Sequence, residues 1–511
     1  MAYLAKCFFR QWVARSLIVL YTAPFALLNG CAWLYGNAMP ESPAAAVAEL
    51  SPKKIPIKFG VTDGTAADAE NLGDLSRVLG EKWWEDFGDN RLNSLVNRVV
   101  NGNLELKQSY ARFLQQDARY KVARADLWPE LSISASADRS RLNLRFLPKQ
   151  TSGFSVKPIN SDFQLSIPAS YEVDIWGRVW HSKEASKSEM HAAKEDYNFA
   201  KLSIIADVAD TYFAIAQACG QLKLIDENLQ SDRRLYELIS ARYVAGLAGA
   251  LDVFQARQNL STNLARQPQL DIELARAKQS LNILLGEFSG ESLECEKTRL
   301  PEFDCVLPET IPATYVLSRP DVLAALYRLR AQHAKLSAVV ASRFPNVLLR
   351  ASGAYVGANI DEVFRPENLV WNLAVELGLT IIDGGRKKAR EELEKAVLDE
   401  VSTSFLRTVL VAFKEVEIAL TEVEAEKRRI QLIRDKELAV RNTLSVSTRD
   451  YLQGLSDLLA VLVARISYYN TQTELLVARR RLLSLYVQVA RTLGVGAPMQ
   501  NSVERVSESR N

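Results

Sequence analysis

Two strand-to-helix junctions of similar sequence constrain the fold of this chain more than any other feature. Residues 163–178 read FQLSIPASYEVDIWGR, and residues 371–386 read WNLAVELGLTIIDGGR. Each is an alternating segment that stops at Asp and Gly and continues directly into a long helical pattern. Because successive side chains of a strand face opposite sides of a sheet, each strand has one apolar and one polar face. Joined to so long a helix, this pattern is typical of a membrane barrel with a water-filled lumen.

The similarity between the two copies extends upstream of the junctions. The segment around Pro129, ARADLWPELSISA, resembles the segment around Pro345, VASRFPNVLLRA. A period of roughly two hundred residues is too long for a solenoid. It indicates duplication of a whole unit that consists of a helix, a Pro, two strands, a Gly junction, a long helix, a turn and a return helix.

The helices that follow the junctions are predicted to be very long. From Arg178 to about Val244 the only helix breaker is Gly220, and residues 386–453 contain neither Gly nor Pro. At 1.5 Å per residue, either helix would span roughly 100 Å, which no globular core can bury. The second helix carries apolar residues every three or four positions, the spacing of a coiled-coil seam: Leu398, Val401, Phe405, Val409, Ala412, Val416, Ala419 and Val423.

Glycines are predicted to shape both ends of these helices. Gly177, Gly384 and Gly385 stand where a strand turns into a helix within one or two residues, which requires backbone angles that Gly adopts at low cost. We predict that these three residues act as strand–helix hinges. Each long helix is expected to double back, at residues 243–253 in the first copy and near residues 445–452 in the second.

The N-terminus has the pattern of a bacterial export signal. Basic residues precede an apolar run at residues 16–28 that is too short for a comfortable transmembrane helix. The following tetrapeptide, Leu28 to Cys31, resembles the bacterial lipobox, which predicts lipidation of Cys31; the alternative is an ordinary signal peptide cleaved nearby. After this signal no run of 18 apolar residues occurs, so no transmembrane helix is expected.

Three further cysteines bear on the mature protein. Cys295 and Cys305 flank a short Pro-containing loop, and disulfides persist in exported proteins. We therefore predict a Cys295–Cys305 disulfide, the alternative being two loop thiols that lie too far apart. Cys219 falls within a helical pattern, and we expect it to be a small buried residue.

Composition and motifs argue against several classes of function. Lys and Arg number 63 and Asp and Glu 61, a net charge of +2 that offers no nucleic-acid footprint. The chain has only 3 histidines, which argues against a His-based metal site. Asp383-Gly-Gly-Arg-Lys lies at a strand–helix junction but lacks the spacing of a phosphate loop, and no nucleophile motif occurs. We expect no enzyme, no cofactor and no metal.

The ordered set of motifs resembles the outer-membrane factor family, the TolC-like outer membrane efflux proteins. Within the family, the lipoprotein branch that serves resistance-nodulation-division pumps is the most similar. The resemblance covers nearly all of residues 80–496. It rests on Trp83-Trp84 with Phe87, Asp89 and Leu92, and on residues 103–106, 123–129, 171–178, 246, 251–256, 284–286, 318–322 and 383–386.

The resemblance implies a mostly α protein with a membrane β-barrel. Each protomer would contribute four strands and long coiled-coil helices, and three protomers would close a 12-stranded β-barrel and a periplasmic α-helical tunnel. An open sheet edge is not tolerated in lipid, so four strands need partners. The implied order is a signal peptide (1–30), a lipid-anchored extended arm (31–79), a first repeat (80–286, strands about 131–146 and 162–176), a connector (287–316), a second repeat (317–496, strands about 346–356 and 370–382) and a flexible tail (497–511).

The resemblance also suggests candidates for a periplasmic gate. Family members carry Gly in the second tip turn, and here that position is read as Ser447. Asp450 and Asp457 are candidates for an acidic ring that narrows the closed tip. The alternative for Asp450 is a helix-start aspartate that complements the helix dipole. Arg449 and Tyr451 are predicted to link neighbouring helices, and Trp83-Trp84 is expected to pack rather than to bind a ligand.

The function implied is a passive exit duct in the outer membrane. Its expected partners are two further copies of the chain, a periplasmic membrane-fusion adaptor, an inner-membrane resistance-nodulation-division transporter and outer-membrane lipid. A type I protein secretion duct is the alternative within the family, and a non-conducting periplasmic coiled-coil scaffold is the alternative outside it. The lumen is expected to be polar, lined by Ser132, Ser134, Gln164, Glu172, Asn372 and Glu376.

Overall fold

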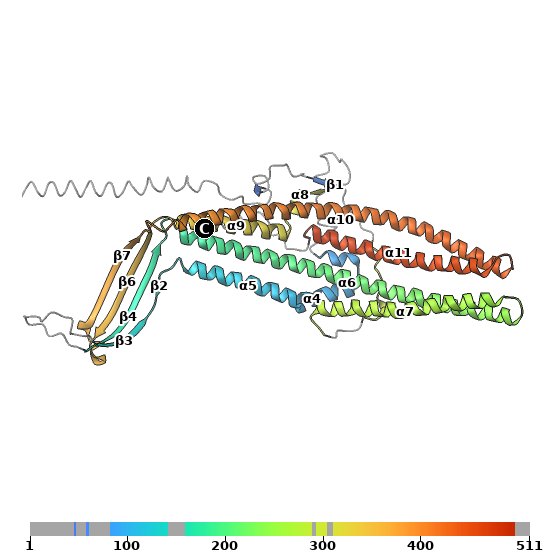
Figure 1. Ribbon diagram of the computed structural model, residues 1–511, viewed down its shortest axis with the longest axis horizontal. Coiled ribbons are helices and arrows are strands. Elements are labelled where there is room, and N and C mark those ends of the chain that lie inside the picture. The colour runs from blue at the N-terminus through green and yellow to red at the C-terminus, as the bar shows by residue number, and fades with distance from the viewer. Residues whose placement is uncertain are drawn as a thin grey trace, which may run out of the picture. The chain divides into compact units, whose positions relative to one another are not determined.

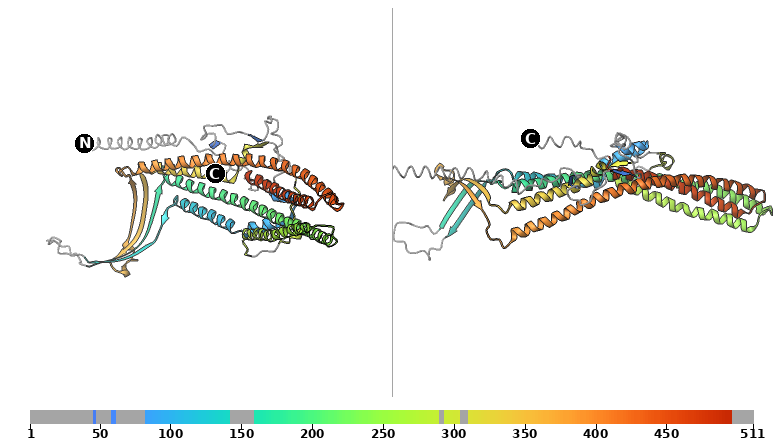
Figure 2. Two further views of the ribbon diagram at one scale, coloured as in Figure 1. Left: turned by 45° about the vertical axis from the view of Figure 1, so that its right-hand side comes forward. Right: turned by 90° about the horizontal axis from the view of Figure 1, so that it is seen from above.

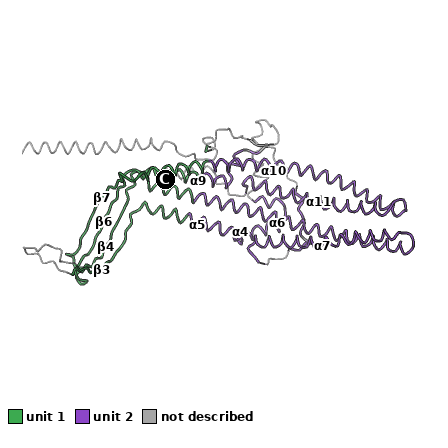
Figure 3. The backbone as a smooth tube through the Cα atoms, in the orientation of Figure 1, with its two compact units in different colours: residues 1–50, 117–189, 328–402 green, residues 51–116, 190–327, 403–511 purple. Residues whose placement is uncertain are grey.

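The structure is a computed structural model, shown as ribbons in Figures 1 and 2. It describes residues 45–46, 58–60, 82–141, 159–288, 293–303 and 310–495. The signal segment, Cys31, most of the arm, Cys305 and the C-terminal tail lie outside these residues. The chain divides into two compact units (Figure 3): residues 1–50, 117–189 and 328–402 form unit 1, and residues 51–116, 190–327 and 403–511 form unit 2.

Unit 1 is built on an antiparallel sheet in the order β2-β4-β6-β7, with β3 also paired to β4. Strand β4 lies between β3 and β6 and makes the longest ladder of the sheet. The strands alternate in polarity, which keeps one face dry and the other wet. Their bounds are β2 (Glu130–Leu131), β3 (Ser134–Arg141), β4 (Ile159–Val173), β6 (Asn346–Gly357) and β7 (Leu369–Gly378).

The strand register gathers the apolar side chains on one face of this sheet. Residues directly opposite each other in an antiparallel pair share a face. Leu165 lies opposite Tyr355 and Tyr355 opposite Leu369, so one apolar row crosses three strands. Among the described residues no helix covers these side chains: Trp371 is 79% exposed and Leu373 72%. Such a face is stable only against an apolar surrounding.

The opposite face of the sheet is polar and carries its own pairs. Arg350 of β6 forms an ion pair with Glu376 of β7 at 3.1 Å. The hydroxyls of Ser134 and Ser166 lie 2.7 Å apart across β3 and β4. The polar residues expected to line a lumen on β3, β4 and β7 share this face by register.

The first strand, expected over residues 131–146, is interrupted by a proline in its partner. Leu131 pairs with Ala169 and Ser134 with Ser166, so β2 and β3 keep one register. Between them the backbone N–H of Ser132 donates to the carbonyl of Pro168. Pro168 has no N–H to return on that side, and the ladder is therefore broken for two residues. Residues 142–146 lie outside the described ranges.

Both lateral edges of the sheet are unpaired among the described residues. β7 is bonded to β6 alone, and β2 and β3 are bonded to β4 alone. Their outer N–H and C=O groups would cost several kcal/mol each in hydrocarbon. A sheet with an exposed apolar face and two open edges therefore needs further strands if it is to lie in a membrane.

Unit 2 is dominated by two helical hairpins, which lie side by side in Figures 1 and 2. The first joins α6 (Arg178–Val244) to α7 (Ala250–Leu285), and the second joins α10 (Arg386–Leu452) to α11 (Leu458–Thr492). α6 and α10 begin within the residues of unit 1, and each is 67 residues long. Both start at the Arg that follows the junction Gly, as the repeat predicts.

The segment from Trp83 to Ala125 is not one continuous helix. It consists of η2 (Trp83–Phe87), α4 (Asn90–Gly102) and α5 (Leu104–Ala125). Gly88 adopts a left-handed conformation with φ 67°, and the Asp89 side chain caps α4 by accepting from the Arg91 N–H at 2.9 Å.

The second break depends on Asn103, which is buried at 3% exposure. Its amide donates to the carbonyl of Leu284 at 2.7 Å and accepts from the N–H of Leu106 at 2.8 Å. Asn103 thus starts α5 and ties it to the end of α7. Gly102 allows this approach, because a Cβ there would lie 2.6 Å from the Leu285 carbonyl oxygen.

Shorter elements complete unit 2. Trp83 and Trp84 are buried, as expected, and Phe87 contacts Phe213 and Phe303 at 5.1 and 4.6 Å between ring centroids. Arg319 binds Asp321, Glu415 and the carbonyl of Thr492. The remaining elements of unit 2 are β1 (Lys58–Gly60), which pairs antiparallel with β5 (Thr310–Pro312), η4 (Cys295–Lys297) and α8 (Ala313–Leu317). α9 (Pro320–Ala341) begins in unit 2 and continues into unit 1, where η5 (Ile360–Glu362) and η6 (Pro366–Asn368) lie between β6 and β7.

Among the described residues, α6 is the one helix that contains an 18-residue window of sufficient length and hydropathy to cross a membrane. The window has a mean hydropathy of 1.2, and 67% of it is buried inside the protein. Such burial is typical of a core helix, so this window is weak evidence of a membrane span.

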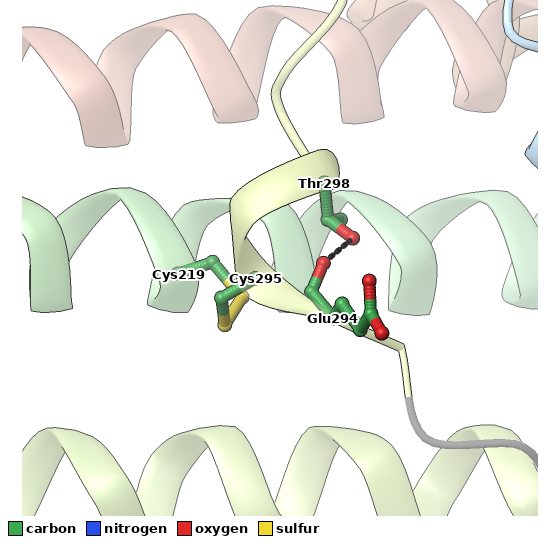
Figure 4. Close-up of a disulfide and its surroundings, with 4 residues drawn as sticks. All are labelled: Cys219, Glu294, Cys295 and Thr298. Atoms are coloured by element: carbon green, nitrogen blue, oxygen red, sulfur yellow. Dashed lines mark hydrogen bonds between the residues drawn. A yellow bond between two sulfur atoms is a disulfide. The ribbon is translucent and has the colours of Figure 1, made fainter.

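The predicted Cys295–Cys305 disulfide is wrong, because Cys295 is bonded to Cys219 of α6 (Figure 4). The two Cα atoms lie 5.2 Å apart, within the range that a disulfide requires. The connector turns at η4, where the hydroxyl of Thr298 donates to the carbonyl of Glu294 at 2.9 Å. The turn places Cys295 against a helix residue 76 positions earlier, a proximity that spacing along the chain does not reveal.

We expect a Cys219→Ser, Cys295→Ser double variant to lose about 2–4 kcal/mol of unfolding free energy, because the cross-link that constrains the unfolded chain is gone. Guanidinium unfolding followed by circular dichroism measures the loss. Cys305→Ser is the matched control and should leave the midpoint unchanged. Peptide mapping of non-reduced protein that returned Cys295 joined to Cys305 would contradict the assignment.

We expect Asn103→Ala to destabilise the protein by about 1–3 kcal/mol, because two buried backbone groups lose their partner. Asn101→Ala is the control: this exposed side chain near the end of α4 donates only to the carbonyl of Asn97. Thermal unfolding midpoints of the two variants compare the effects. Equal midpoints would mean that Asn103 does not hold α5 against α7.

Candidate functional site

The three predicted hinge glycines all adopt positive φ at the strand–helix junctions. The φ values are 74° at Gly177, 66° at Gly384 and 86° at Gly385. Non-glycine residues rarely adopt these angles, so a side chain at any of the three positions would strain the backbone. The change from strand to helix at each junction therefore depends on backbone angles that are readily available only to glycine.

Two aspartates at these junctions cap the long helices. Asp174 accepts from the N–H of Trp180 at 2.7 Å, at the start of α6. Asp383 accepts from the N–H groups of Gly385 and Lys387 at 3.0 and 2.9 Å, at the start of α10. These bonds lower the pKa of Asp383, the Lys387 N–H being the largest cause. Sequence reasoning missed this role, although an Asp shortly before a junction Gly is its signal.

The first junction is held further by its own Trp176 and Arg178 side chains, which contact the start of β6 and the end of β4. The indole N–H of Trp176 donates to the carbonyl of Pro345 at 2.7 Å, and its ring stacks on Phe344. Arg178 makes two hydrogen bonds to the carboxylate of Glu172. The start of α6 is thereby fixed to the ends of β4 and β6.

At the opposite ends of α6 and α10, both hairpins turn with one shared geometry. The N–H of Leu247 donates to the carbonyl of Arg242, and the N–H of Leu455 donates to that of Asp450, each at 2.8 Å. Gly246 and Gly454, with φ 70° and 75°, precede these leucines. This is the Schellman arrangement, in which a left-handed Gly lets the last helical carbonyls find donors.

The second turn therefore lies at residues 453–457, and its predicted position near 445–452 is wrong. Residues 445–452 contain no breaker and remain helical, with the hydroxyl of Ser447 bonded back to the carbonyl of Thr443 at 2.7 Å. Consequently Ser447 does not replace a turn glycine. Gly454 occupies that role, and the two tip turns are alike.

The two acidic gate candidates lie on different sides of this turn. Asp450 is in the last turn of α10 and contacts Arg449 at 3.3 Å. It is not a helix-start residue, because the helix ends two residues later. Asp457 has that role: it is the N-cap of α11 and accepts from the N–H of Ala460 at 3.1 Å.

Tyr451 packs against the first hairpin, and the ion pair of Arg449 is with Asp450 of its own helix. Tyr451 is 8% exposed and packs with Ile239 of α6, Ala256 of α7 and Leu458 of α11. The guanidinium of Arg242 lies 5.1 Å from the centre of its ring, a cation–π contact between α6 and α10. Burial raises the pKa of the Tyr451 hydroxyl. We call Tyr451 and Arg242 the tip latch.

A buried polar cluster joins the two hairpins farther from the tip than the tip latch. Asp232 of α6 is 2% exposed, accepts from the amide of Asn263 at 2.7 Å and lies 3.3 Å from Arg465 of α11. Burial raises the pKa of Asp232 and lowers that of Arg465. Sequence reasoning missed this cluster, because the sequence pattern does not distinguish a buried charged residue of a helix from a solvent-exposed one.

A shallow groove of about 430 Å³ follows the second hairpin from its tip, between α10 and α11. Val440 and Thr443 line one side, and Leu459, Val463 and Ser467 line the other. Among the residues that the structure describes, no group of three or more His, Cys, Asp or Glu side chains could hold a metal ion. The described part of the tip therefore offers paired helices with apolar and charged side chains, and no metal-binding group.

Comparisons with known proteins agree with this architecture. The sequence model of the outer membrane efflux protein family matches residues 95–287 and 313–495. Nodulation protein T of Rhizobium leguminosarum bv. trifolii is 29% identical over 93% of this chain and 97% of its own length. The probable efflux pump outer membrane protein TtgC of Pseudomonas putida is 26% identical over 95% of this chain and 96% of its own.

Solved structures give the same result. The outer-membrane channel OprN aligns with a TM-score of 0.77 at 25% identity, covering 82% of this chain and 93% of that one. The Campylobacter jejuni CmeC outer membrane channel aligns with a TM-score of 0.78 at 22% identity, covering 89% and 96%, and shows the fold alone. The resemblance seen in the sequence is confirmed, and the chain belongs to the outer membrane efflux protein family, as an outer-membrane channel of an efflux system.

Proposed function

We propose that three copies of this chain form a duct that receives small molecules from an inner-membrane resistance-nodulation-division pump through a periplasmic adaptor. The observation that carries this proposal is the sheet of unit 1, with one exposed apolar face and two open edges. Joined edge to edge, three such sheets close a barrel in which every strand is paired. A lipid chain on Cys31 would add a second attachment to the same membrane.

Small molecules are proposed as the cargo in preference to an exported protein. Relatives are named toluene efflux pump outer membrane protein TtgF and pyoverdine export outer membrane protein OpmQ, both from Pseudomonas, at 27% identity. Those cargoes belong to those proteins. A coiled-coil scaffold without a channel would have no use for an exposed apolar sheet face.

We propose further that the tip of the helical hairpins is the gate. Asp450 lies at the end of α10, where three copies around one axis would bring three carboxylates together. Like charges repel and attract cations in a narrow passage. The tip latch and the Asp232 cluster hold the two hairpins of each copy together. An adaptor that engages the hairpins would open the tip by separating them.

Planar-bilayer conductance of the purified protein tests both the duct and the acidic ring. We expect the wild type to conduct weakly with cation preference, and Asp450→Ala to conduct more with less preference, because the ring of negative charge is removed. Asp435→Ala, an exposed acid on the same helix, is the control and should behave as wild type. Unchanged conductance in Asp450→Ala would contradict the proposal of an acidic ring at Asp450. Absence of conductance in every variant would contradict the proposal of a duct.

The latch has its own test in the same recording. We expect Arg242→Gln to raise the open-to-closed ratio about fivefold per copy, because a contact worth ~1 kcal/mol in the closed tip is lost. Arg234→Gln is the matched control, since Arg234 is an exposed arginine on the same helix, α6. Equal open probabilities in the two variants would show that the latch does not hold the gate.

A further inference from the structure

The apolar face of the sheet becomes basic at the end farthest from the helices. Along β3, the residues on this face are Ala135 and Ala137, followed by Arg139 and Arg141. The strand enters from α5 at its other end, so the two arginines lie toward the β3–β4 connection. A pair of cations on a lipid-facing surface is costly in hydrocarbon and needs an explanation.

The strand register assigns both arginines to the apolar face. Ala137 lies opposite Phe163, Arg139 opposite Ser161 and Arg141 opposite Ile159. The pairing continues without a bulge, and opposite residues share a face. Both arginines are exposed. They therefore point to the same side as Phe163 and Leu165, and away from the polar face.

Their height along the strand places them just outside the hydrocarbon. The unbroken apolar row on this face of β4 runs from Val173 to Phe163, where Ser161 interrupts it before Ile159. This row is roughly 33 Å of strand at 3.3 Å per residue. A strand tilt of about 40° reduces this to ~25 Å, the height of the apolar band of a membrane barrel. Phe163 then marks the edge of the band, and Arg139 and Arg141 lie roughly 5 and 10 Å beyond it.

Neither arginine has an ion pair or a side-chain hydrogen bond among the residues that the structure describes. The nearest acids along the two strands, Asp138 and Asp162, lie opposite each other on the polar face. By contrast, Arg350 on the polar face is paired with Glu376 at 3.1 Å. The outward pair therefore presents two guanidinium groups at headgroup level, each able to hold a phosphate through two parallel hydrogen bonds.

We propose that Arg139 and Arg141 bind the phosphate groups of a phosphorylated glycolipid in the outer leaflet of the outer membrane. The inference rests on the proposed barrel, which turns the apolar face toward lipid and the β3–β4 connection toward the cell exterior. Each copy carries one such site. In the closed barrel, each site would lie beside the seam where β3 of one copy pairs with a strand of the next copy.

Native mass spectrometry of the purified assembly, titrated with diphosphoryl lipid A, tests the site. We expect the Arg139→Gln, Arg141→Gln double variant to bind at least about tenfold more weakly than wild type, because charge-assisted bonds to phosphate are lost. Arg350→Gln is the matched control: it removes one arginine from the opposite face of the same sheet and should bind as wild type.

Two further probes identify the lipid chemistry. Dephosphorylated lipid A should bind the wild type no better than it binds the double variant, and phosphatidylglycerol should show a smaller difference between the two proteins. Equal affinity of wild type and double variant for diphosphoryl lipid A would overturn the proposal. An equal loss with phosphatidylglycerol would overturn the glycolipid assignment. Bilayer conductance of the double variant should match wild type, which separates a failure of the lipid site from a failure of the duct.

Discussion

The whole architecture depends on the hydrogen-bonding requirement of strand edges in lipid. Unit 1 presents one apolar face, but its outer strands β3 and β7 leave their outward backbone groups without partners among the described residues. Water can satisfy such groups and hydrocarbon cannot. Closure by further copies removes both edges at once, so the same constraint that admits the sheet to a membrane also makes the protein an oligomer.

Both halves of the repeat contribute to the sheet and to the helical hairpins, and the two parts achieve a specific structure in different ways. In the sheet, specificity comes from register, because a slip of one residue would move every apolar side chain of a strand to the polar face. In the hairpins it comes from a few polar contacts among apolar seams, chiefly Asp232 with Arg465 and Tyr451 with Arg242. Removing one partner of a buried charge pair costs more stability than the intact pair contributes. Such contacts therefore favour one arrangement of the helices over alternative arrangements.

Much of the fold could be predicted from hydrophobic periodicity and from helix breakers. The features that depend on contacts between residues distant in sequence could not be predicted. The bounds of α6 and the start of α10 follow from long helical patterns, and the strand positions follow from alternation. The gap between β2 and β3 depends on Pro168 in a partner strand, and the break at Asn103 depends on Leu284. The sequence pattern predicts the wrong partner for Cys295, and the second tip turn lies at Gly454, later than predicted. The tip latch combines a predicted residue, Tyr451, with an unpredicted one, Arg242.

The equal lengths of α6 and α10 have a consequence for how such a chain can change over evolution. Both helices start at strand ends of one sheet, and both turn beside one shared apolar cluster that contains Ile239 and Tyr451. Adding a single helical turn to one of them would shift its turn by about 5 Å relative to the other. Insertions and deletions in the two halves are therefore tolerated only as matched pairs, so the duplicated halves must keep a common length long after their sequences have diverged.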